Sequence, residues 1–293
     1  MFRPLFVLAG TAVLGVLGVN VIGNALIEPL PAHPFWSTPT PRVIAHRGGR
    51  GLWPENTLYA FEHAAALGVD VLEMDLRRSS DGEIVVLHDE SVDRTTDGEG
   101  LVKGFPLAQL KQLDAGYRFT SDDGASHPYR GQGISIPTLR EVLDALPQTR
   151  LNLEMKPGDP GMAAPLCELI AANGAQQRVA VASIDQPAMD AFRAACPEVA
   201  TAATKDEVVS FVRLSKLHVP ALHRPAAQVL QVPDRLGAYE LLTEGFLRDA
   251  AAFNLKVEVW TVNAPQDMQR LLAMNVDGIM TDFPDRLLKL LGR

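Results

Sequence analysis

The sequence predicts an α/β protein: a (β/α)8 TIM barrel preceded by one N-terminal transmembrane helix. From Arg42 onward, short apolar runs alternate with helical patterns, which is typical of parallel α/β folds. About eight such strand–helix steps occupy about 250 residues, the usual length of a closed eight-fold barrel. The first 28 residues are mostly apolar, and the next stretch is rich in proline. We therefore expect a membrane anchor over residues 1–28, a proline-rich linker over residues 29–41 and one barrel domain over residues 42–293.

The predicted anchor is the apolar run from Leu5 to Ile27. About 23 residues at 1.5 Å each are enough to cross about 30 Å of hydrocarbon. Arg3 is the only charge before the run, so the positive-inside rule places the N-terminus in the cytoplasm and the barrel on the extracytoplasmic side. The alternative is a cleaved signal peptide and a secreted protein, but no A-x-A site follows the run. The linker that follows is expected to be a stiff spacer.

The barrel elements follow from periodicity. The expected strands are Val43–Ala45, Val71–Leu76, Ile84–Leu87, Leu151–Met155, Val179–Ser183, Val199–Ala203, His218–Leu222, Val257–Thr261 and Gly278–Met280. The expected helices are Thr57–Leu67, Leu139–Leu146, Met162–Ala172, Gln186–Ala195, Asp206–Leu214, Glu244–Asn254, Pro265–Met274 and Pro284–Leu291. Residues 95–137 break this rhythm, because they are rich in Gly, Asp and Ser with one helix-like piece, Leu107–Leu113. They are predicted to form an insertion on the face where barrel enzymes keep their chemistry.

The overall charge limits the classes of partner. The net charge is −8, the pI is near 5.4, and no dense Lys/Arg stripe is present. Nucleic acid is therefore not an expected partner, because phosphate-backbone binding needs concentrated positive charge. The oligomeric state does not follow from the sequence.

The two cysteines, Cys167 and Cys196, both lie in alanine-rich helical segments. An oxidising compartment would permit a disulfide between them. Two buried thiols is the interpretation favoured by the helical setting.

Two predicted strands carry acidic side chains on one face. Glu73 and Asp75 are two positions apart, so they point to the same side of their strand, and Glu154 shares a face with Lys156 in the same way. Buried charges persist when they are paired or bound to metal. A buried Lys–Glu network is the structural alternative. Three carboxylates against one lysine leave excess negative charge, which favours a hard divalent cation, Mg²⁺ or Ca²⁺, over zinc.

Two histidines end predicted strands close to these carboxylates. His46 follows the run from Val43 to Ala45, and His88 follows the run from Ile84 to Leu87. Histidine suits acid/base work near neutral pH. Two strand-end histidines beside a carboxylate cluster indicate a catalytic pair.

Taken in order, these motifs resemble the glycerophosphodiester phosphodiesterase family. The resemblance runs from about Arg42 to the C-terminus. It is carried by His46-Arg47-Gly48-Gly49, Pro54-Glu55-Asn56-Thr57, Glu73-x-Asp75, Asp81-Gly82, His88-Asp89, Arg94-Thr95-Thr96, Leu153-Glu154-Met155-Lys156, Trp260-Thr261-Val262-Asn263, Asp277-Gly278 and Thr281-Asp282.

The resemblance implies a role for each matching residue. Glu73, Asp75 and Glu154 match the family's metal ligands, and His46 and His88 match its general acid/base pair. Arg47 and Lys156 match phosphate contacts, and Trp260 matches an aromatic wall of the cleft, with a core tryptophan as the alternative. Glu55 is a further substrate-binding candidate, and its other expected role is at the start of a helix that Asn56 would cap. Either histidine is compatible with either proton-transfer role.

The implied activity is metal-dependent hydrolysis of glycerophosphodiesters to sn-glycerol 3-phosphate and an alcohol. A lysophospholipase D acting on lysophospholipids is the alternative, since a membrane anchor would hold the barrel beside lipid. A metal-independent phospholipase C-like enzyme would not need the three carboxylates. A catalytically inactive barrel used as a binding module would not need both histidines.

Overall fold

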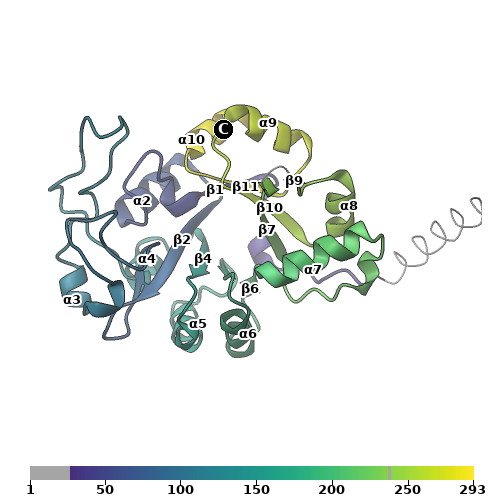
Figure 1. Ribbon diagram of the computed structural model, residues 1–293, viewed down its shortest axis with the longest axis horizontal. Coiled ribbons are helices and arrows are strands. Elements are labelled where there is room, and N and C mark those ends of the chain that lie inside the picture. Colours follow the sequence, from purple (N-terminus) through teal and green to yellow (C-terminus); the bar gives the residue numbers. More distant parts are fainter. Residues whose placement is uncertain (1–26, 237–238) are drawn as a thin grey trace, which may run out of the picture.

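The computed structural model describes residues 27–236 and 239–293. It contains a nearly closed barrel of eight parallel strands, which confirms the predicted (β/α)8 architecture (Figure 1). The strands follow the order β6-β5-β4-β2-β1-β11-β10-β7 around the barrel. A parallel bridge between Ala202 and Val229 joins the two ends of this order. The barrel strands are β1 (Arg42–Ala45), β2 (Val71–Arg78), β4 (Arg150–Met155), β5 (Val179–Ala182), β6 (Ala200–Thr201), β7 (Val229–Pro233), β10 (Lys256–Trp260) and β11 (Gly278–Thr281).

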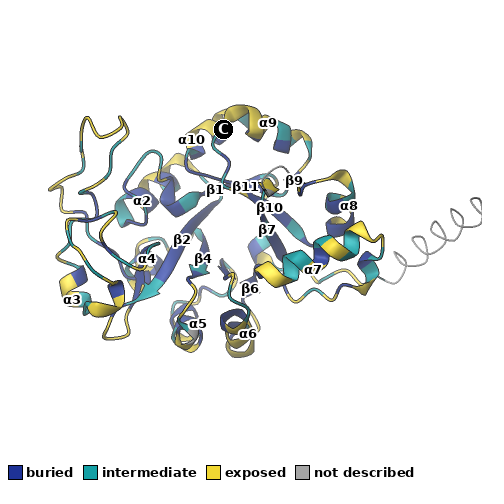
Figure 2. Cartoon of the chain, in the orientation of Figure 1, coloured by how far each residue is buried: buried dark blue, intermediate teal, exposed yellow. Residues whose placement is uncertain are grey.

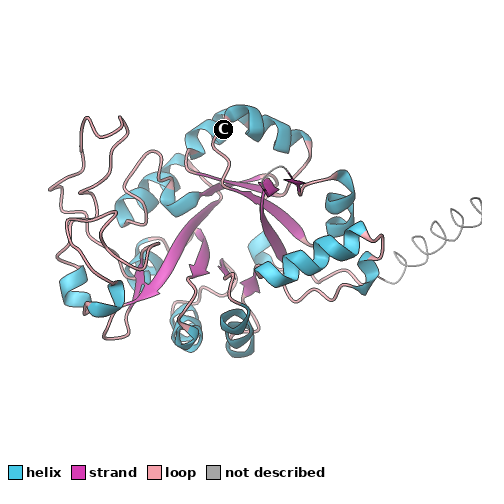
Figure 3. Cartoon of the chain, viewed as in Figure 1, coloured by secondary structure: helices cyan, strands magenta, loops and turns pink. Residues whose placement is uncertain are grey.

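One main helix follows each barrel strand, and the helices surround the strands (Figure 3). They are α2 (Leu58–Leu67), α4 (Leu139–Ala145), α5 (Ala163–Ala172), α6 (Gln186–Ala195), α7 (Lys205–Lys216), α8 (Glu244–Ala252), α9 (Pro265–Ala273) and α10 (Pro284–Leu290). Several begin at a side-chain cap. Thr138 and Thr204, for example, each form a capping box with the glutamate three residues later. The sequence therefore marks where these helices start.

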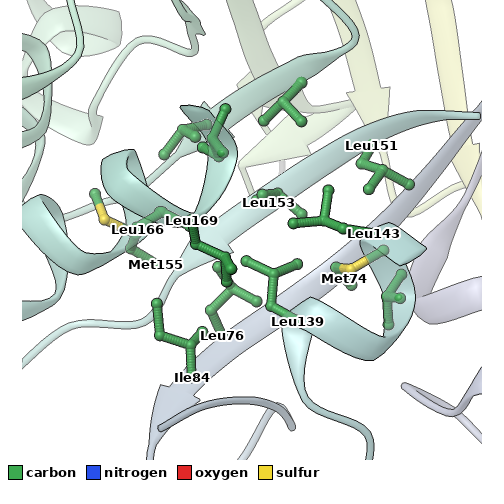
Figure 4. Packing of buried hydrophobic residues seen from close by; sticks show 14 of the residues in the cluster. Met74, Leu76, Ile84, Leu139, Leu143, Leu151, Leu153, Met155, Leu166 and Leu169 are labelled. Atoms are coloured by element: carbon green, nitrogen blue, oxygen red, sulfur yellow. The ribbon is translucent and has the colours of Figure 1, made fainter. Parts of the chain in front are cut away.

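Outward-facing strand residues and inward-facing helix residues form the main apolar layer (Figures 2 and 4). Met74 of β2 and Leu153 of β4 are fully buried against α4 and α5, where they meet Leu139 and Leu166. Their neighbours Glu73, Asp75 and Glu154 point the other way, because successive strand residues alternate faces. Replacing a fully buried leucine such as Leu153 by alanine would cost about 2–5 kcal/mol.

Two strand predictions differ from the structure. The expected strand His218–Leu222 is instead a turn followed by the short 3₁₀ helix Pro220–Leu222, because Pro220 has no N–H to give to a sheet. The barrel strand at this place is β7, which the pattern missed. The expected strand Ile84–Leu87 does form, as β3 (Ile84–Val86), but it pairs antiparallel with the end of β2 outside the barrel.

The predicted insertion follows β3, and it is the loop-rich lobe that contains α3 in Figure 1. Its helical elements are the 3₁₀ helix Val102–Gly104 and α3 (Leu107–Leu110). The lobe has its own apolar cluster, in which Val102 and Leu110 are buried against Val85 of β3. A short hairpin of β8 (Arg235–Leu236) and β9 (Tyr239–Glu240) follows β7.

Residues 29–41, expected to be a stiff spacer, are packed against the barrel. The Leu30 N–H donates to the Phe253 carbonyl at 2.9 Å, just before β10 begins. Phe35, in the 3₁₀ helix Pro34–Trp36, is 1% exposed and packs inside the barrel against Val71 at the start of β2. The aromatic residues among the prolines explain the difference, because they bury apolar surface that a spacer would leave in water. The segment therefore closes the amino-terminal end of the barrel.

The predicted anchor lies almost wholly outside the described residues, so it stays a prediction. Within residues 27–236 and 239–293, no helix is long and apolar enough to span a membrane. The prediction of two free thiols was wrong, because Cys167 and Cys196 form a disulfide. The disulfide links α5 to the end of α6, two neighbouring helices on the outside of the barrel. Each helix taken alone gives no sign of this contact.

Candidate active site

The predicted site residues meet at the carboxyl ends of the barrel strands, around a cavity of about 380 Å³. His46 directly follows β1, Glu73 lies within β2, and Glu154 is next to the last residue of β4. These three residues line the cavity together with His88, Arg47, Lys156 and Trp260. Parallel strands bring their carboxyl ends to one face of a barrel, which is why residues far apart in sequence converge here.

Glu73, Asp75 and Glu154 form one compact cluster. Each offers a carboxylate oxygen, and the three oxygens lie within 4.8 Å of one another. Burial raises the pKa of Glu73 well above its ordinary value, and the neighbouring charges of Asp75 and Glu154 add to the rise. Burial also raises the pKa of Glu154, although Lys156 opposes it. The structure thus concentrates negative charge that the protein alone does not neutralise.

Two cationic side chains contact the cluster, and both form salt bridges with Asp75. Lys156 Nζ lies 2.7 Å from Asp75 Oδ1 and 2.9 Å from Glu154 Oε2. Arg47 Nε lies 3.1 Å from Asp75 Oδ2. Burial alone would raise the pKa of Asp75, but these cations hold it below its ordinary value. Glu73 accepts the backbone N–H of Arg47, at 2.8 Å. Three carboxylates face two cations, which leaves excess negative charge. Carboxylate oxygens are hard donors, so the cluster fits a bound Mg²⁺ or Ca²⁺.

Both histidines are bonded through Nδ1 to a carboxylate. His46 Nδ1 lies 2.6 Å from Asp282 Oδ1, and His88 Nδ1 lies 2.6 Å from Asp89 Oδ1. A carboxylate accepts hydrogen bonds, so Nδ1 is the protonated nitrogen and Nε2 is left for chemistry in the cavity. Burial lowers the pKa of His88, and the bond to Asp89 opposes that shift.

The aspartates are themselves held by further side chains. Asn263 donates to Asp282 Oδ2 at 2.8 Å, and Arg50 Nε donates to Asp282 Oδ1 at 2.9 Å. Arg94 Nε donates to Asp89 Oδ2 at 2.6 Å. Burial works against ionisation of Asp89, but its bonds from Arg94 and His88 lower its pKa to about 2. Both acids therefore stay charged and hold the imidazole rings in one orientation.

Glu55 does not line the cavity. It accepts from Arg47 Nη1 at 2.8 Å and from both terminal nitrogens of Arg94 at 2.8 Å. Burial alone would raise its pKa, but the two arginines hold it below its ordinary value. Glu55 is thus placed to fix Arg47 beside the carboxylates and Arg94 beside Asp89.

A tight turn carries Arg47 to the site. Arg47 has φ = 51°, in the left-handed region, within the 3₁₀ turn His46–Gly48. Gly48 follows at φ = 79°, and a Cβ at this glycine would lie 2.8 Å from the Phe61 ring of α2. The glycine is therefore required both by the backbone and by the close approach of α2.

Trp260 is not a core residue and Asn56 is not a helix cap, although the sequence allowed both roles. Trp260 is 41% exposed and lines the cavity, so it is not a core tryptophan. The cap of α2 is Thr57, which accepts from the Ala60 N–H, and not Asn56 as expected. Asn56 instead donates to Asp75 Oδ2 at 2.9 Å and orients that carboxylate.

Comparison with known proteins identifies the family. The model of the glycerophosphoryl diester phosphodiesterase family matches residues 46–286. The chain belongs to this family. It is 34% identical to a glycerophosphodiester phosphodiesterase from Caldanaerobacter subterraneus, a match that covers 86% of this chain and 98% of that protein. A second relative, from Bacillus altitudinis, is 31% identical, with 85% of this chain and 97% of that protein covered.

Solved structures agree with this assignment. The structure of an Oleispira antarctica phosphodiesterase in complex with the product sn-glycerol 3-phosphate is similar, with a TM-score of 0.68 and 29% identity. That match covers 86% of this chain and 97% of the Oleispira chain. A glycerophosphoryl diester phosphodiesterase structure from Silicibacter pomeroyi has a TM-score of 0.71 and 27% identity, over 93% of this chain and 96% of that one. The chain is accordingly a phosphodiester hydrolase by family and by fold.

The family's motifs already contained the partners that strand periodicity missed. Asp89, Arg94 and Asp282 stand within the motifs that carry the resemblance, but none of them alternates with apolar residues on a predicted strand. Asp89 follows His88 directly, and an acid next to a strand-end histidine is a usable signal. Asp282 gives no such local signal, because its bond to His46 spans 236 positions.

Proposed function

We propose that this chain hydrolyses glycerophosphodiesters to sn-glycerol 3-phosphate and an alcohol. The observation that carries the proposal is the arrangement of the cavity: two histidines, each held by an aspartate, border one cluster of three carboxylates. The product complex of the Oleispira relative supports the choice of product.

Glu73, Asp75 and Glu154 are the proposed ligands of a divalent cation. When bound, such a cation would lower the pKa of a coordinated hydroxyl and neutralise charge on a phosphate oxygen. Mg²⁺ and Ca²⁺ both suit three carboxylates. Asn56 holds Asp75, Lys156 holds both Asp75 and Glu154, and the Arg47 N–H holds Glu73. The three ligands are therefore oriented before any cation arrives.

His46 and His88 are the proposed proton-transfer pair. One Nε2 removes the proton of the attacking hydroxyl, which belongs to water or to the glycerol 2-position, and the other donates a proton to the leaving alcohol oxygen. Attack by the glycerol 2-hydroxyl gives a cyclic phosphate, which water then opens to sn-glycerol 3-phosphate. Asp282 and Asp89 stabilise each ring when it is positively charged. The cationic side chains of Arg47 and Lys156 are placed to bind the anionic phosphate, and Trp260 forms one wall against the carbon skeleton of the substrate.

The lysophospholipase D alternative depended on a tether that brings the cleft to lipid. Residues 29–41 pack at the amino-terminal end of the barrel, whereas the cavity opens at the carboxyl ends of the strands. An anchor that ended near residue 27 would therefore bring the amino-terminal end of the barrel, and not the cleft, to the membrane. Glycerophosphodiesters thus remain the proposed substrate.

We also propose that the barrel lies on the extracytoplasmic side of a membrane, anchored by residues 1–28. The disulfide between Cys167 and Cys196 supports export, because disulfides persist in oxidising compartments. A protease-protection assay on spheroplasts, with N-terminal sequencing, tests this. A mature N-terminus beyond Ile27 would remove the anchor.

One assay tests the proposed activity. Purified protein is incubated with glycerophosphocholine or lysophosphatidylcholine, each with and without EDTA. Choline release from glycerophosphocholine that EDTA abolishes is the expected result. Release from lysophosphatidylcholine alone would favour lysophospholipase D, EDTA-resistant release would favour a metal-independent enzyme, and no release would favour a binding module.

A further inference from the structure

A second cavity adjoins the catalytic one. It has a volume of about 370 Å³, and Lys156 lines both cavities. Three segments surround it: the end of β2, the connection from β4 to α5, and residues 101–103 of the insertion. In Figure 1, β2 is the long strand that runs toward α3 and the insertion. The insertion thus completes a pocket beside the site, which a barrel without it would lack.

Some charged residues of this second cavity form salt bridges, and others do not. Arg78 is bonded to Asp159 through two nitrogens, so these two charges cancel. Within the described part of the chain, Arg77, Lys103 and Glu90 form no salt bridge. Two cations and one carboxylate of the lining thus stand outside salt bridges, and Glu90 is the carboxylate whose charge acts most strongly on Arg77.

Arg77 connects the second cavity to the chemistry. It lies on the same face of β2 as Glu73 and Asp75, because the three residues are two positions apart. Its Nε donates to the backbone carbonyl of His88 at 2.9 Å. A group bound by the outer nitrogens of Arg77 would thus lie beside His88, next to the phosphate position bounded by Lys156.

We propose that the second cavity binds the alcohol portion of the substrate, and that it selects alcohols that carry an anionic group, a phosphate or a carboxylate. This inference rests on the proposed phosphodiesterase activity. A guanidinium and an ammonium group both bind such anions, and the arginine does so with two donors at once. Lys103 is exposed at the rim, where it attracts the same charge.

The cavity is poorly suited to choline. Proteins that recognise a quaternary ammonium surround it with aromatic rings. None of the residues that line the second cavity is aromatic, and its apolar floor consists of Leu76, Val102 and Met162. In the described lining, Glu90 is the acid that forms no salt bridge, and its charge already acts on Arg77.

The test compares three substrates: glycerophosphocholine, glycerophosphoserine, and bis(glycerophospho)glycerol, which carries a second phosphodiester. The measured quantity is the ratio of kcat/KM for each anionic substrate to kcat/KM for glycerophosphocholine. Because Arg77 also holds the His88 carbonyl, Arg77→Gln is judged by this ratio, which cancels a general loss of turnover. We expect the ratio to fall about tenfold, as for the loss of one charged hydrogen bond.

Two further variants keep the proposal falsifiable if Arg77→Gln does not fold. Lys103→Gln should lower the ratio about threefold, while Glu90→Gln should raise the ratio by a similar factor. Lys289→Gln, which removes an exposed lysine of α10, is the matched control and should change nothing.

The outcomes separate the two claims. Ratios unchanged in both Arg77→Gln and Lys103→Gln would overturn the subsite, and so would a wild-type preference for glycerophosphocholine. A wild-type protein that hydrolyses none of the three substrates would overturn the proposed function itself. The better of the two anionic substrates tells whether phosphate or carboxylate is the group that is bound.

Discussion

The amino-terminal end of the barrel interior pairs one buried anion with one buried cation, whereas the carboxyl-terminal end sets a cluster of three carboxylates against two cations. At the amino-terminal end, Arg42 Nε lies 3.2 Å from Glu258 Oε1, Gln231 donates to the second oxygen at 2.9 Å, and Trp36 stacks on the guanidinium. At the other end, Glu73 forms no salt bridge within the described residues and accepts the backbone N–H of Arg47. The first arrangement is a balanced ion pair. The second has the excess charge expected of a cation site.

The largest effect on catalysis is expected at the carboxyl-terminal end, where three carboxylates face two cations. Glu73→Gln keeps the size of the side chain but removes a proposed metal ligand. Metal ions supply several kcal/mol of transition-state stabilisation, so kcat/KM should fall about 10³-fold or more. Steady-state assays with glycerophosphocholine measure this. The folded state should persist, because the substitution relieves repulsion from Asp75 and Glu154. Near-normal turnover would remove Glu73 from the site.

Substitutions in the balanced ion pair at the amino-terminal end should change the stability of the protein and not its catalytic rate. Glu258→Ala leaves Arg42 buried without its partner, which should lower the free energy of unfolding by about 3–5 kcal/mol. The double variant with Arg42→Met should recover most of that loss. Asp267→Asn breaks an exposed ion pair with Arg270 and should cost at most about 1 kcal/mol. Urea denaturation gives these values. A small loss in Glu258→Ala would contradict the balanced-pair account.

The histidines come next, since their proposed role is in proton transfer and they bury little apolar surface. His46→Ala and His88→Ala should each lower kcat by at least about 10²-fold, the scale of a general acid or base. Circular dichroism should show an unchanged fold. A variant that keeps nearly all of its kcat would exclude that histidine from proton transfer, and a variant that fails to fold would favour a structural role.

The smallest effect concerns Asp89, whose pKa is about 2 in the folded protein against an ordinary value of 3.8. A lowered pKa stabilises the folded state above the unfolded value, and this contribution is lost as pH falls from about 4 to 2. Because Asp89 is partly exposed, the contribution is about 1 kcal/mol after allowance for solvent screening. The difference in stability between wild type and Asp89→Asn should be largest near pH 6 and vanish near pH 2. A constant difference would assign the effect to packing.

The sequence predicted those parts of the site that depend on one strand at a time. Alternation along β2 and β4 was enough to put Glu73, Asp75 and Glu154 on inward faces. The His46–Asp282 bond was not predictable in this way, because it requires β1 and β11 to be neighbours in the barrel. The disulfide required α5 and α6 to be neighbours, and β7 was missed because nearby His218–Leu222 is also apolar. Contacts between elements, together with strand β7, were beyond local patterns.

The most direct test of the central claim is cation binding at the unbalanced end. Metal-free protein, verified by elemental analysis, is titrated with Mg²⁺ and with Ca²⁺ by calorimetry, and glycerophosphocholine turnover is followed in parallel. The account predicts one bound equivalent of at least one of these ions, recovery of turnover with that equivalent, and loss of binding in Glu73→Gln but not in Asp267→Asn. Full turnover by the metal-free protein, or unchanged binding in Glu73→Gln, would contradict it.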